Sequence, residues 1–336
     1  MPEAAAAARV EPAARTERTL RGAAIAGLGA ALPPTVVPNA QIAERLGVDD
    51  HWIQKRLGIS ERRFVADEER LDDLAAEASV MALERAGIPA AEVDLVLVCT
   101  VTQDEIMPNT APLVAGKIGA GRAGAADVGS ACLGFVSGLA LATAQIEANR
   151  ADVVLLVGAE MLSRYLDPDD RRTAPLFGDG AGSVVMTAVD PPGRIGPCIL
   201  RADDAGRELV RIDRVDEHMR MEGQETFVYA VDYVSDVTLQ AVAAAGLTLD
   251  DVDVFAYHQG NARILKSVGE RLGLDGAKVV NCIAELGNTS SASIPLALHV
   301  AEREGRLFDG ARVLVSGIGA GWTWGAAVLE WGTDGV

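Results

Sequence analysis

Short runs of apolar, β-branched residues recur along the chain, and each follows a segment whose apolar residues have helical spacing. The clearest example is residues 82–94, where a helical pattern ends at a glycine and leads into the apolar run 95–99. Strands that are buried on both faces of a sheet read as continuous apolar runs, so this pattern predicts helices packed on a mixed or parallel sheet. The expected fold class is therefore α/β.

The same pattern occurs again in the C-terminal part of the chain. Residues 241–253 repeat the arrangement of residues 82–94, and the apolar run 254–258 follows them. A second pair of similar segments is formed by residues 152–158 and 312–317. Chance similarity between amphipathic segments is the alternative, but ordered self-similarity of this kind is typical of an internal duplication.

We therefore expect two related α/β halves, residues 21–190 and residues 191–336, preceded by a disordered N-terminal arm of residues 1–20. The arm is rich in Ala and Arg, but it lacks an apolar segment and contains three glutamates, which disfavours a targeting peptide. Two halves that face each other would bring the equivalent strand ends, Cys99 and His258, close to a shared pseudo-two-fold axis. Active sites are common at interfaces of this kind.

The charge balance limits the partners that the chain can have. Its 336 residues include 48 Asp and Glu against 30 Lys and Arg, a formal net charge of −18. Nucleic acids and anionic membranes attract clustered positive charge, so we expect neither as a general partner. The uncharged residues 128–146 just reach the length of a membrane span, but their glycines and missing aromatic or basic flanks favour a buried helix. An acidic partner would have to bind a local basic patch.

The four cysteines lie far apart, without the spacing of a zinc site or a disulfide scaffold, and this favours a reducing, cytoplasmic location. Cys132 stands between a strand-like segment and a long apolar helix. Near a helix N-terminus the macrodipole favours the thiolate, so Cys132 is a candidate nucleophile. Taken alone, such a residue is more often a buried structural cysteine.

Further candidate chemistry lies at the ends of the C-terminal strands. His258 ends an apolar run and is followed by glutamine and asparagine, and open α/β sheets bind ligands at such positions. Asn288 precedes the apolar helix 296–300, where it could also be only a turn or cap residue. The glycine-rich residues 317–325 would let backbone N–H groups approach a ligand closely.

A nicotinamide-dependent enzyme is not expected. The other glycine pair, Gly27 and Gly29, is followed by Pro33 and Pro34. Prolines at these positions are incompatible with the helix that a dinucleotide-binding turn requires.

Taken together, these segments resemble the β-ketoacyl-acyl-carrier-protein synthase III family of thiolase-like condensing enzymes. The resemblance extends from about residue 21 to the C-terminus. Six ordered segments carry it: residues 50–59, 129–135, 177–182, 258–261, 287–290 and 317–325. It implies a thiolase-like five-layer αβαβα fold of two duplicated halves, assembled as a homodimer.

The resemblance also implies a catalytic triad of Cys132, His258 and Asn288. Cys132 would attack an acyl-CoA thioester and hold the acyl group covalently, with the backbone N–H groups of Cys132 and Ala320 as the oxyanion hole. His258 and Asn288 would then bind the carbonyl of a malonyl thioester on acyl carrier protein and stabilise the enolate left by decarboxylation. No metal and no further cofactor are implied.

For the CoA substrate, the resemblance implies that Trp52 stacks on the adenine, although a tryptophan is more often a core residue. Other residues are expected along the nucleotide and the pantetheine arm: Arg56, Arg171, Gly223, Phe227 and Asn261.

Three positions depart from the family pattern. Met107 stands where a phenylalanine often closes the acyl pocket from the neighbouring subunit, and the flexible methionine favours a primer longer or more branched than acetyl. Among the basic residues expected to bind the carrier protein, Arg263 and Arg271 are present, whereas Val228 and Glu270 replace lysines. We therefore expect carrier binding to be weaker or to involve a different partner.

The leading hypothesis is a decarboxylative condensation that primes fatty-acid or polyketide synthesis. An acyltransferase acting on an alcohol or amine of a specialised metabolite is the alternative within the same fold, but relatives of that kind tend to replace the asparagine. A non-catalytic partner subunit would lack the nucleophilic Cys132.

Overall fold

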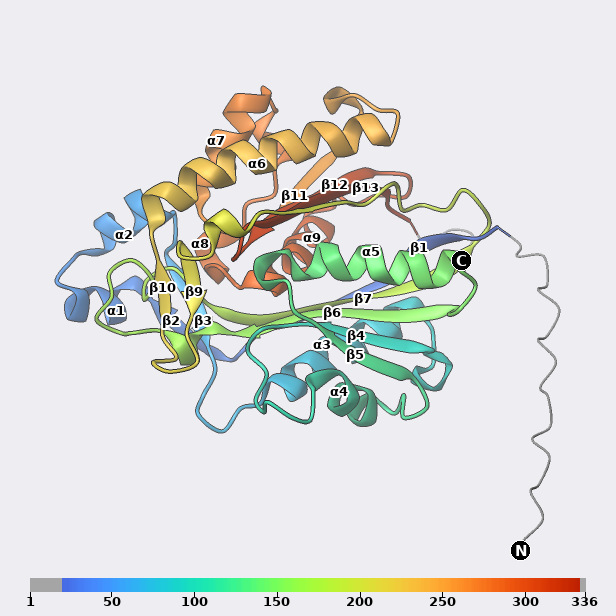
Figure 1. Cartoon of the computed structure of the whole chain (residues 1–336), viewed down its shortest axis with the longest axis horizontal. Helices are drawn as coiled ribbons and strands as arrows, with labels where there is room; N and C mark the ends of the chain where they lie inside the picture. Colours follow the sequence, from blue (N-terminus) through green and yellow to red (C-terminus); the bar gives the residue numbers. More distant parts are fainter. Residues whose placement is uncertain (1–19, 333–336) are drawn as a thin grey trace, which may run out of the picture.

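The computed structural model describes residues 20–332, so the predicted arm lies outside the described residues except for Leu20. Two mixed β-sheets form the frame of the fold (Figure 1). The first sheet has the order β1-β7-β6-β4-β5, with β1 (Gly22–Ala31), β4 (Leu95–Cys99), β5 (Gly124–Val128), β6 (Val153–Met161) and β7 (Asp179–Val189). The second has the order β11-β12-β13-β8, with β8 (Ile199–Ala202), β11 (Val254–Tyr257), β12 (Arg312–Gly319) and β13 (Thr323–Glu330).

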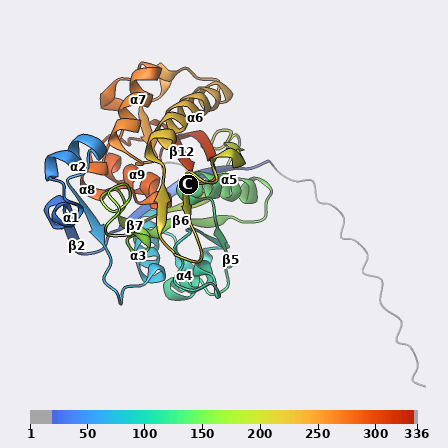
Figure 2. The same cartoon turned by 60° about the vertical axis from the view of Figure 1, so that its left-hand side comes forward.

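The helices form three layers, which alternate with the two sheets. Helices α3 (Leu71–Ala86) and α4 (Thr110–Ile118) cover the outer face of the first sheet, and α6 (Gly223–Ala244) and α7 (Ala262–Leu272) cover the outer face of the second (Figures 1 and 2). Helices α5 (Gly134–Glu147) and α9 (Ser293–Arg303) lie between the sheets. The predicted five-layer αβαβα arrangement is confirmed.

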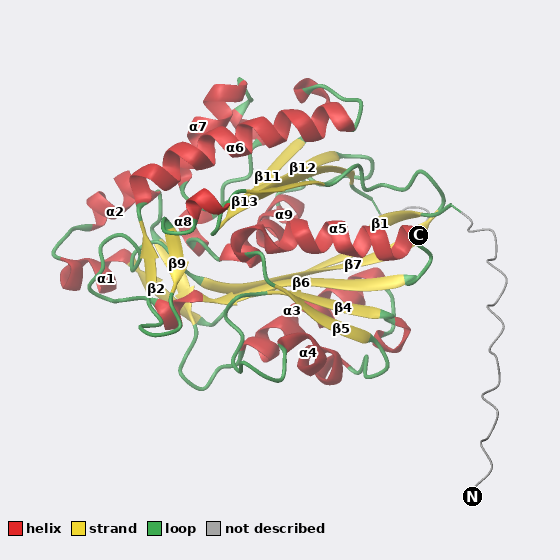
Figure 3. Ribbon diagram, viewed as in Figure 1, coloured by secondary structure: helices red, strands yellow, loops and turns green. Residues whose placement is uncertain are grey.

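The remaining elements gather at one end of the layered body, on the side of α1 and α2 (Figure 3). They are α1 (Asn39–Leu46), α2 (Asp50–Leu57), α8 (Ile283–Leu286) and two short hairpins. The hairpins are β2 (Thr35–Pro38) with β3 (Glu61–Phe64) and β9 (Val210–Ile212) with β10 (Met219–Met221).

The two sheets have equivalent topologies. In each, a parallel pair (β4 with β6, β11 with β12) is followed by two antiparallel neighbours (β7 and β1, β13 and β8). The aspartates paired by the sequence comparison have equivalent contacts. Asp94 accepts hydrogen bonds from the backbone N–H groups of Asp152 and Val153, and Asp253 accepts one from Arg312. An offset of 159 residues therefore relates β4, α5 and β6 of the first half to β11, α9 and β12 of the second.

Most of helix α5 is buried between the sheets, which explains the lack of charge in residues 134–146. Phe135, Leu139 and Ile146 are fully buried in the core that both sheets share. The uncharged run of the sequence is thus divided between the end of β5, a turn and α5, which begins only at Gly134. In residues 20–332, no helix is both long and apolar enough to span a membrane.

Candidate active site

Cys132 lies in a short 3₁₀ turn, η2 (Ala131–Leu133), directly before α5. Ala131 in this turn has a left-handed backbone with φ of 46°, which is strained for a residue with a Cβ. The equivalent turn of the other half, η7 (Ser290–Ala292), precedes α9 and has the same conformation at Ser290, with φ of 49°. Two turns of unusual geometry therefore meet at the seam between the halves.

A cavity of about 1460 Å³ opens above Cys132. Most of the residues predicted for the site line it, although they come from segments far apart in the sequence: Trp52, Arg56, Cys132, Arg171, Gly223, Phe227, His258, Asn261, Arg263, Asn288 and Ala320. Met107 and Arg271 do not line this cavity. Arg271 forms an ion pair with Asp232 instead.

His258 directly follows β11, and only 8 % of its surface is exposed. Its Nδ1 atom lies 2.6 Å from Ser293 Oγ, which also accepts a hydrogen bond from the backbone N–H of Gln259 at 3.3 Å. The Ser293 hydroxyl can either donate to Nδ1 or accept a hydrogen from it. We assign the ring hydrogen of His258 to Nε2, with Ser293 as the donor.

The backbone of Asn288 is hydrogen-bonded through both its N–H group and its carbonyl group. Its backbone N–H donates to Leu176 and its backbone carbonyl accepts from Gly178, and the side chain is only 5 % exposed. Its Oδ1 atom accepts the backbone N–H of Ser290 at 2.9 Å. The Nδ2 group makes no hydrogen bond within residues 20–332, so it is available as a donor to a molecule in the cavity.

Burial sets the protonation states of Cys132 and His258. It lowers the pKa of His258 to about 4, against a smaller opposing effect of the Ser290 backbone, so the imidazole is neutral at pH 7. Burial also raises the pKa of Cys132 to about 11, although a hydrogen bond with the Ser290 side chain opposes this. Desolvation therefore opposes the preference of a helix N-terminus for the thiolate.

The glycine-rich segment 317–325 is mostly strand. Gly317 and Gly319 belong to β12, and only residues 320–322 form the turn into β13. A Cβ atom at Gly319 would lie 2.7 Å from the Ser130 carbonyl oxygen and 3.0 Å from the Leu133 nitrogen. Glycine therefore lets the strand approach the Cys132 turn closely and brings Ala320 to the cavity wall.

The mouth of the cavity is cationic, although the chain as a whole is acidic. The guanidinium of Arg56 lies 4.8 Å from the centre of the Trp52 ring, and that of Arg263 lies 5.2 Å from the Phe227 ring. Within residues 20–332, neither these arginines nor Arg171 form an ion pair. Unpaired guanidinium groups of this kind are suited to phosphate binding.

Two family models match the chain. Residues 126–204 match the family model of 3-oxoacyl-[acyl-carrier-protein (ACP)] synthase III, and residues 242–331 match the model of its C-terminal part. The chain belongs to the 3-oxoacyl-[acyl-carrier-protein] synthase III family.

Individual relatives cover nearly the whole chain. The beta-ketoacyl-[acyl-carrier-protein] synthase III of Rhodospirillum rubrum is 43 % identical over 319 residues, 91 % of this chain and 98 % of the relative. The synthase III 2 of Streptomyces coelicolor is 42 % identical over 312 residues, 92 % of this chain and 94 % of the relative. The crystal structure of the priming beta-ketosynthase of the R1128 polyketide pathway superposes with a TM-score of 0.91 at 33 % identity, covering 95 % of this chain and 99 % of the other.

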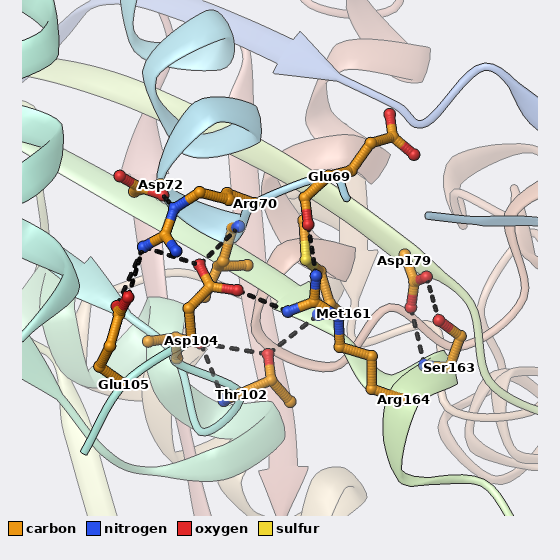
Figure 4. A network of polar contacts seen from close by, with 12 residues as sticks. Glu69, Arg70, Asp72, Thr102, Asp104, Glu105, Met161, Ser163, Arg164 and Asp179 are labelled. Carbon is orange, nitrogen blue, oxygen red and sulfur yellow. Dashed lines mark hydrogen bonds and ion pairs between the residues drawn. The ribbon is translucent and has the colours of Figure 1, made fainter. Parts of the chain in front are cut away.

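In this synthase III, Met107 lies on a loop that leaves the body of the protein, and 84 % of its surface is exposed. A polar network fixes the start of the loop (Figure 4). Asp104 accepts the backbone N–H of Leu71 at 2.9 Å and pairs with Arg164, and Glu105 accepts two hydrogen bonds from Arg70 at 2.9 and 3.0 Å. The loop is thus anchored, while Ile106 and Met107 at its tip are exposed.

Several site residues were missed by the sequence reasoning. Ser293 and Ser290 hold the polar groups of the site, but serines near an asparagine look like ordinary turn residues in sequence. Apolar cavity residues were also missed, among them Leu162, Leu176, Phe177, Ile212 and Met221. They come from four separate elements, so no local pattern could identify them.

Proposed function

We propose that this synthase III transfers an acyl group from acyl-CoA to Cys132 and condenses it with a malonyl thioester on acyl carrier protein, which primes fatty-acid or polyketide synthesis. The observation that carries the proposal is the joint position of Cys132, His258 and Asn288 on one cavity. The nucleophile and two fixed N–H donors thereby face the same space.

The first half-reaction uses Cys132. Its sulfur attacks the thioester carbonyl, and the backbone N–H groups of Cys132 and Ala320 stabilise the negative charge that develops on the oxygen. A donor of this kind is worth about 3–4 kcal/mol in related chemistry. CoA then leaves, and the acyl group remains on the sulfur.

The second half-reaction uses the two donors. His258 Nε2–H and Asn288 Nδ2–H hydrogen-bond the malonyl thioester carbonyl and stabilise the enolate that forms when carbon dioxide leaves. Because the imidazole is neutral and Ser293 holds its Nδ1 atom, the ring is positioned as a hydrogen-bond donor that needs no reorganisation. The enolate carbon attacks the acyl group on Cys132 and releases the β-ketoacyl product.

The cavity supports a primer longer or more branched than acetyl. Its volume of about 1460 Å³ exceeds the usual range of roughly 300–1,000 Å³ for small-molecule sites, so it has room for an acyl chain beside the CoA arm. An apolar wall of Leu162, Leu176, Phe177, Ile212 and Met221 suits such a chain. Trp52, Arg56, Arg171, Gly223, Phe227 and Asn261 would bind the CoA portion.

Two macromolecular partners follow from the surface. The acyl carrier protein is acidic, and the unpaired Arg263 at the mouth suits it better than Arg271, whose charge Asp232 offsets. A second copy of the chain would cover the exposed loop tip of Ile106 and Met107, so that Met107 reaches the partner's acyl pocket. Sedimentation of the wild type and of Met107→Glu tests the homodimer, because a buried glutamate should dissociate it.

The four free cysteines suit a reducing cytoplasm.

The decisive experiment is intact-protein mass spectrometry after incubation with a panel of acyl-CoA primers. We expect one acyl adduct on the wild type and none on Cys132→Ala, with the longest accepted primer reporting the depth of the cavity. Adding malonyl-carrier protein should release carbon dioxide and the β-ketoacyl product. An adduct that persists in Cys132→Ala would refute the nucleophile, and acyl transfer without carbon dioxide would establish the simple acyltransferase instead.

A further inference from the structure

Arg62 on β3 is fully buried, although arginine is among the residues that folded proteins almost never bury completely without a paired charge. Within residues 20–332 it forms no ion pair with a carboxylate, and its Nε atom makes no hydrogen bond. Burial lowers the pKa of Arg62 to about 10, so the guanidinium group is still charged at pH 7. A buried charge of this kind is costly, so the contacts that it makes indicate what it does.

The guanidinium group of Arg62 donates to three oxygen atoms, which belong to β2, to α1 and to the loop before β7. Its Nη1 atom donates to the Val37 carbonyl at 3.1 Å. Its Nη2 atom donates to Asn39 Oδ1 at 2.9 Å and to the Pro175 carbonyl at 2.7 Å. All three hydrogen bonds are buried. A planar group that bonds three oxygens fixes their relative positions more firmly than a single-point donor would.

Asn39 anchors one side of this group of contacts. Its Nδ2 atom donates to the Asp50 carboxylate and to the Ile59 carbonyl, each at 2.6 Å, while its Oδ1 atom accepts from Arg62. Asn39 is buried as well. Arg62 is therefore tied to the segment of residues 39–59 and provides a fixed point for whatever its other hydrogen bonds hold.

On the other side, Pro175 begins the segment that holds the backbone of Asn288. The carbonyl of the next residue, Leu176, accepts the Asn288 N–H at 2.9 Å, and the N–H of Gly178 donates to the Asn288 carbonyl at 3.0 Å. Phe177 and Asn288 thereby form a parallel bridge. Holding the Pro175 carbonyl therefore holds the start of the segment to which Asn288 is bonded.

The base of the Arg62 side chain packs beside both segments of this bridge. A Cβ atom added at Gly178 would lie 3.1 Å from Arg62 Cβ, and one added at Gly287 would lie 3.2 Å from the same atom. Glycine at both positions leaves room for Arg62, and Gly287 also has a left-handed backbone with φ of 65°. Arg62 thus contacts the bridge through its stem and secures it through its guanidinium group.

We propose that Arg62 is a positioning residue for the condensation step: it holds residues 175–178 and, through them, orients the Nδ2 group of Asn288 in the cavity. The inference rests on the proposed function, in which Asn288 donates to the malonyl thioester. Arg62 does not line the cavity, so it acts through Asn288 and not on the substrate. A donor must be held close to its productive geometry, and Asn288 needs this support because it lies on a turn and not inside a helix or strand.

The two half-reactions separate this role from a general effect on folding. Arg62→Met keeps an apolar stem and removes the guanidinium group, so the three oxygens lose their donor. We expect carbon dioxide release from malonyl-carrier protein to slow about 10- to 100-fold, the range for a misplaced catalytic group. The single-turnover rate of Cys132 acylation at saturating acyl-CoA should change by less than about threefold, because Asn288 takes no part in that step. Carbon dioxide release at the wild-type rate would overturn the proposal.

A double variant tests whether Arg62 acts through Asn288. In an Asn288→Ala background, Arg62→Met should slow carbon dioxide release by no more than about twofold, because the group that it positions is absent. Effects that multiply in the double variant would overturn the proposal. Asn288→Ala alone tests the proposed function, since release at the wild-type rate in that variant would show that Asn288 is not the donor, whatever Arg62 does.

Arg63→Met is the matched control. Arg63 is the next residue on β3, so its side chain lies on the opposite face of the hairpin, where it donates to the Pro33 carbonyl at 3.3 Å. Both half-reactions should proceed in this variant as in the wild type, and an equal loss in the two arginine variants would overturn the proposal by showing a general disturbance of the hairpin.

A second variant covers the case in which Arg62→Met fails to fold. Arg62→Lys retains the charge, but a lysine cannot reproduce the planar arrangement of donors to all three oxygens. We expect it to slow carbon dioxide release and to leave acylation unchanged. Unchanged release of carbon dioxide in Arg62→Lys, or equal slowing of both half-reactions, would refute the role of Arg62.

Discussion

The hydrogen bond between Ser293 and His258 offers a way to separate the two half-reactions. Replacing Ser293 with alanine removes the only hydrogen-bond partner of Nδ1 seen in residues 20–332 and leaves this buried nitrogen unsatisfied. The ring hydrogen is then no longer held on Nε2. His258 would lose part of its ability to donate to the malonyl thioester, while Cys132, Ala320 and their N–H groups remain in place.

The size of the effect follows from the geometry. The Ser293–His258 contact is 2.6 Å long and buried, and an unsatisfied buried polar group costs about 1–3 kcal/mol. At 1.36 kcal/mol per factor of ten, decarboxylative condensation should slow by about 5- to 150-fold. Acylation does not involve the ring donor, so its rate should change by less than about threefold.

The assay measures acylation by mass spectrometry in a single turnover and carbon dioxide release from malonyl-carrier protein in a second experiment. Ser291→Ala is the matched control, because Ser291 is equally buried but donates to the Cys99 carbonyl at 2.7 Å and not to His258. Equal slowing of both half-reactions in Ser293→Ala, or unchanged release of carbon dioxide, would refute the assignment of the tautomer.

Two further predictions concern stability. The folded-state pKa of His258, about 4, lies below its unfolded value of 6.5, so the unfolded chain binds a proton first as the pH falls. The free energy of unfolding should therefore drop by about 3 kcal/mol more for the wild type than for His258→Gln between pH 6.5 and pH 4, measured by urea denaturation. Comparison with the variant is needed because Asp179 also titrates in this range. Burial raises its pKa to about 6, so its protonation increases the free energy of unfolding as the pH falls. A Cβ atom at Gly158 would lie 2.4 Å from the Ser291 carbonyl oxygen, so Gly158→Ala should cost about 1–3 kcal/mol in thermal unfolding. Gly269→Ala, where the added Cβ meets nothing within 4 Å in a helix, should be neutral or stabilising, and a similar loss in both variants would contradict the steric argument.

The elements that could be predicted from the sequence are those whose signal is local. The apolar run 95–99 coincides with β4, and the run 254–258 gives β11 with His258 immediately after it. Strand ends of a duplicated α/β fold meet at the seam, so the pattern predicts the position of His258 there, and the resemblance adds Cys132 to the same cavity.

The electrostatics of the site could not be predicted in the same way. A helix N-terminus is visible in the sequence, but the desolvation that raises the pKa of Cys132 depends on residues from both halves. Glu160 and Ser290 are separated by 130 residues, and only folding places the carboxylate beside the hydroxyl. Residues of this kind are identified by their buried contacts, which no local motif records.

The two left-handed turns show that the two halves have different roles at the site. By the offset of 159 residues, Ala131 corresponds to Ser290, Cys132 to Ser291 and His258 to Cys99. The chain therefore holds two copies of one turn arrangement. Ser291 in the second copy occupies the place that Cys132 occupies in the first. That second copy donates a hydrogen bond to Cys99 instead of attacking a substrate. In the proposed mechanism, one copy performs the covalent chemistry and the other supports it structurally.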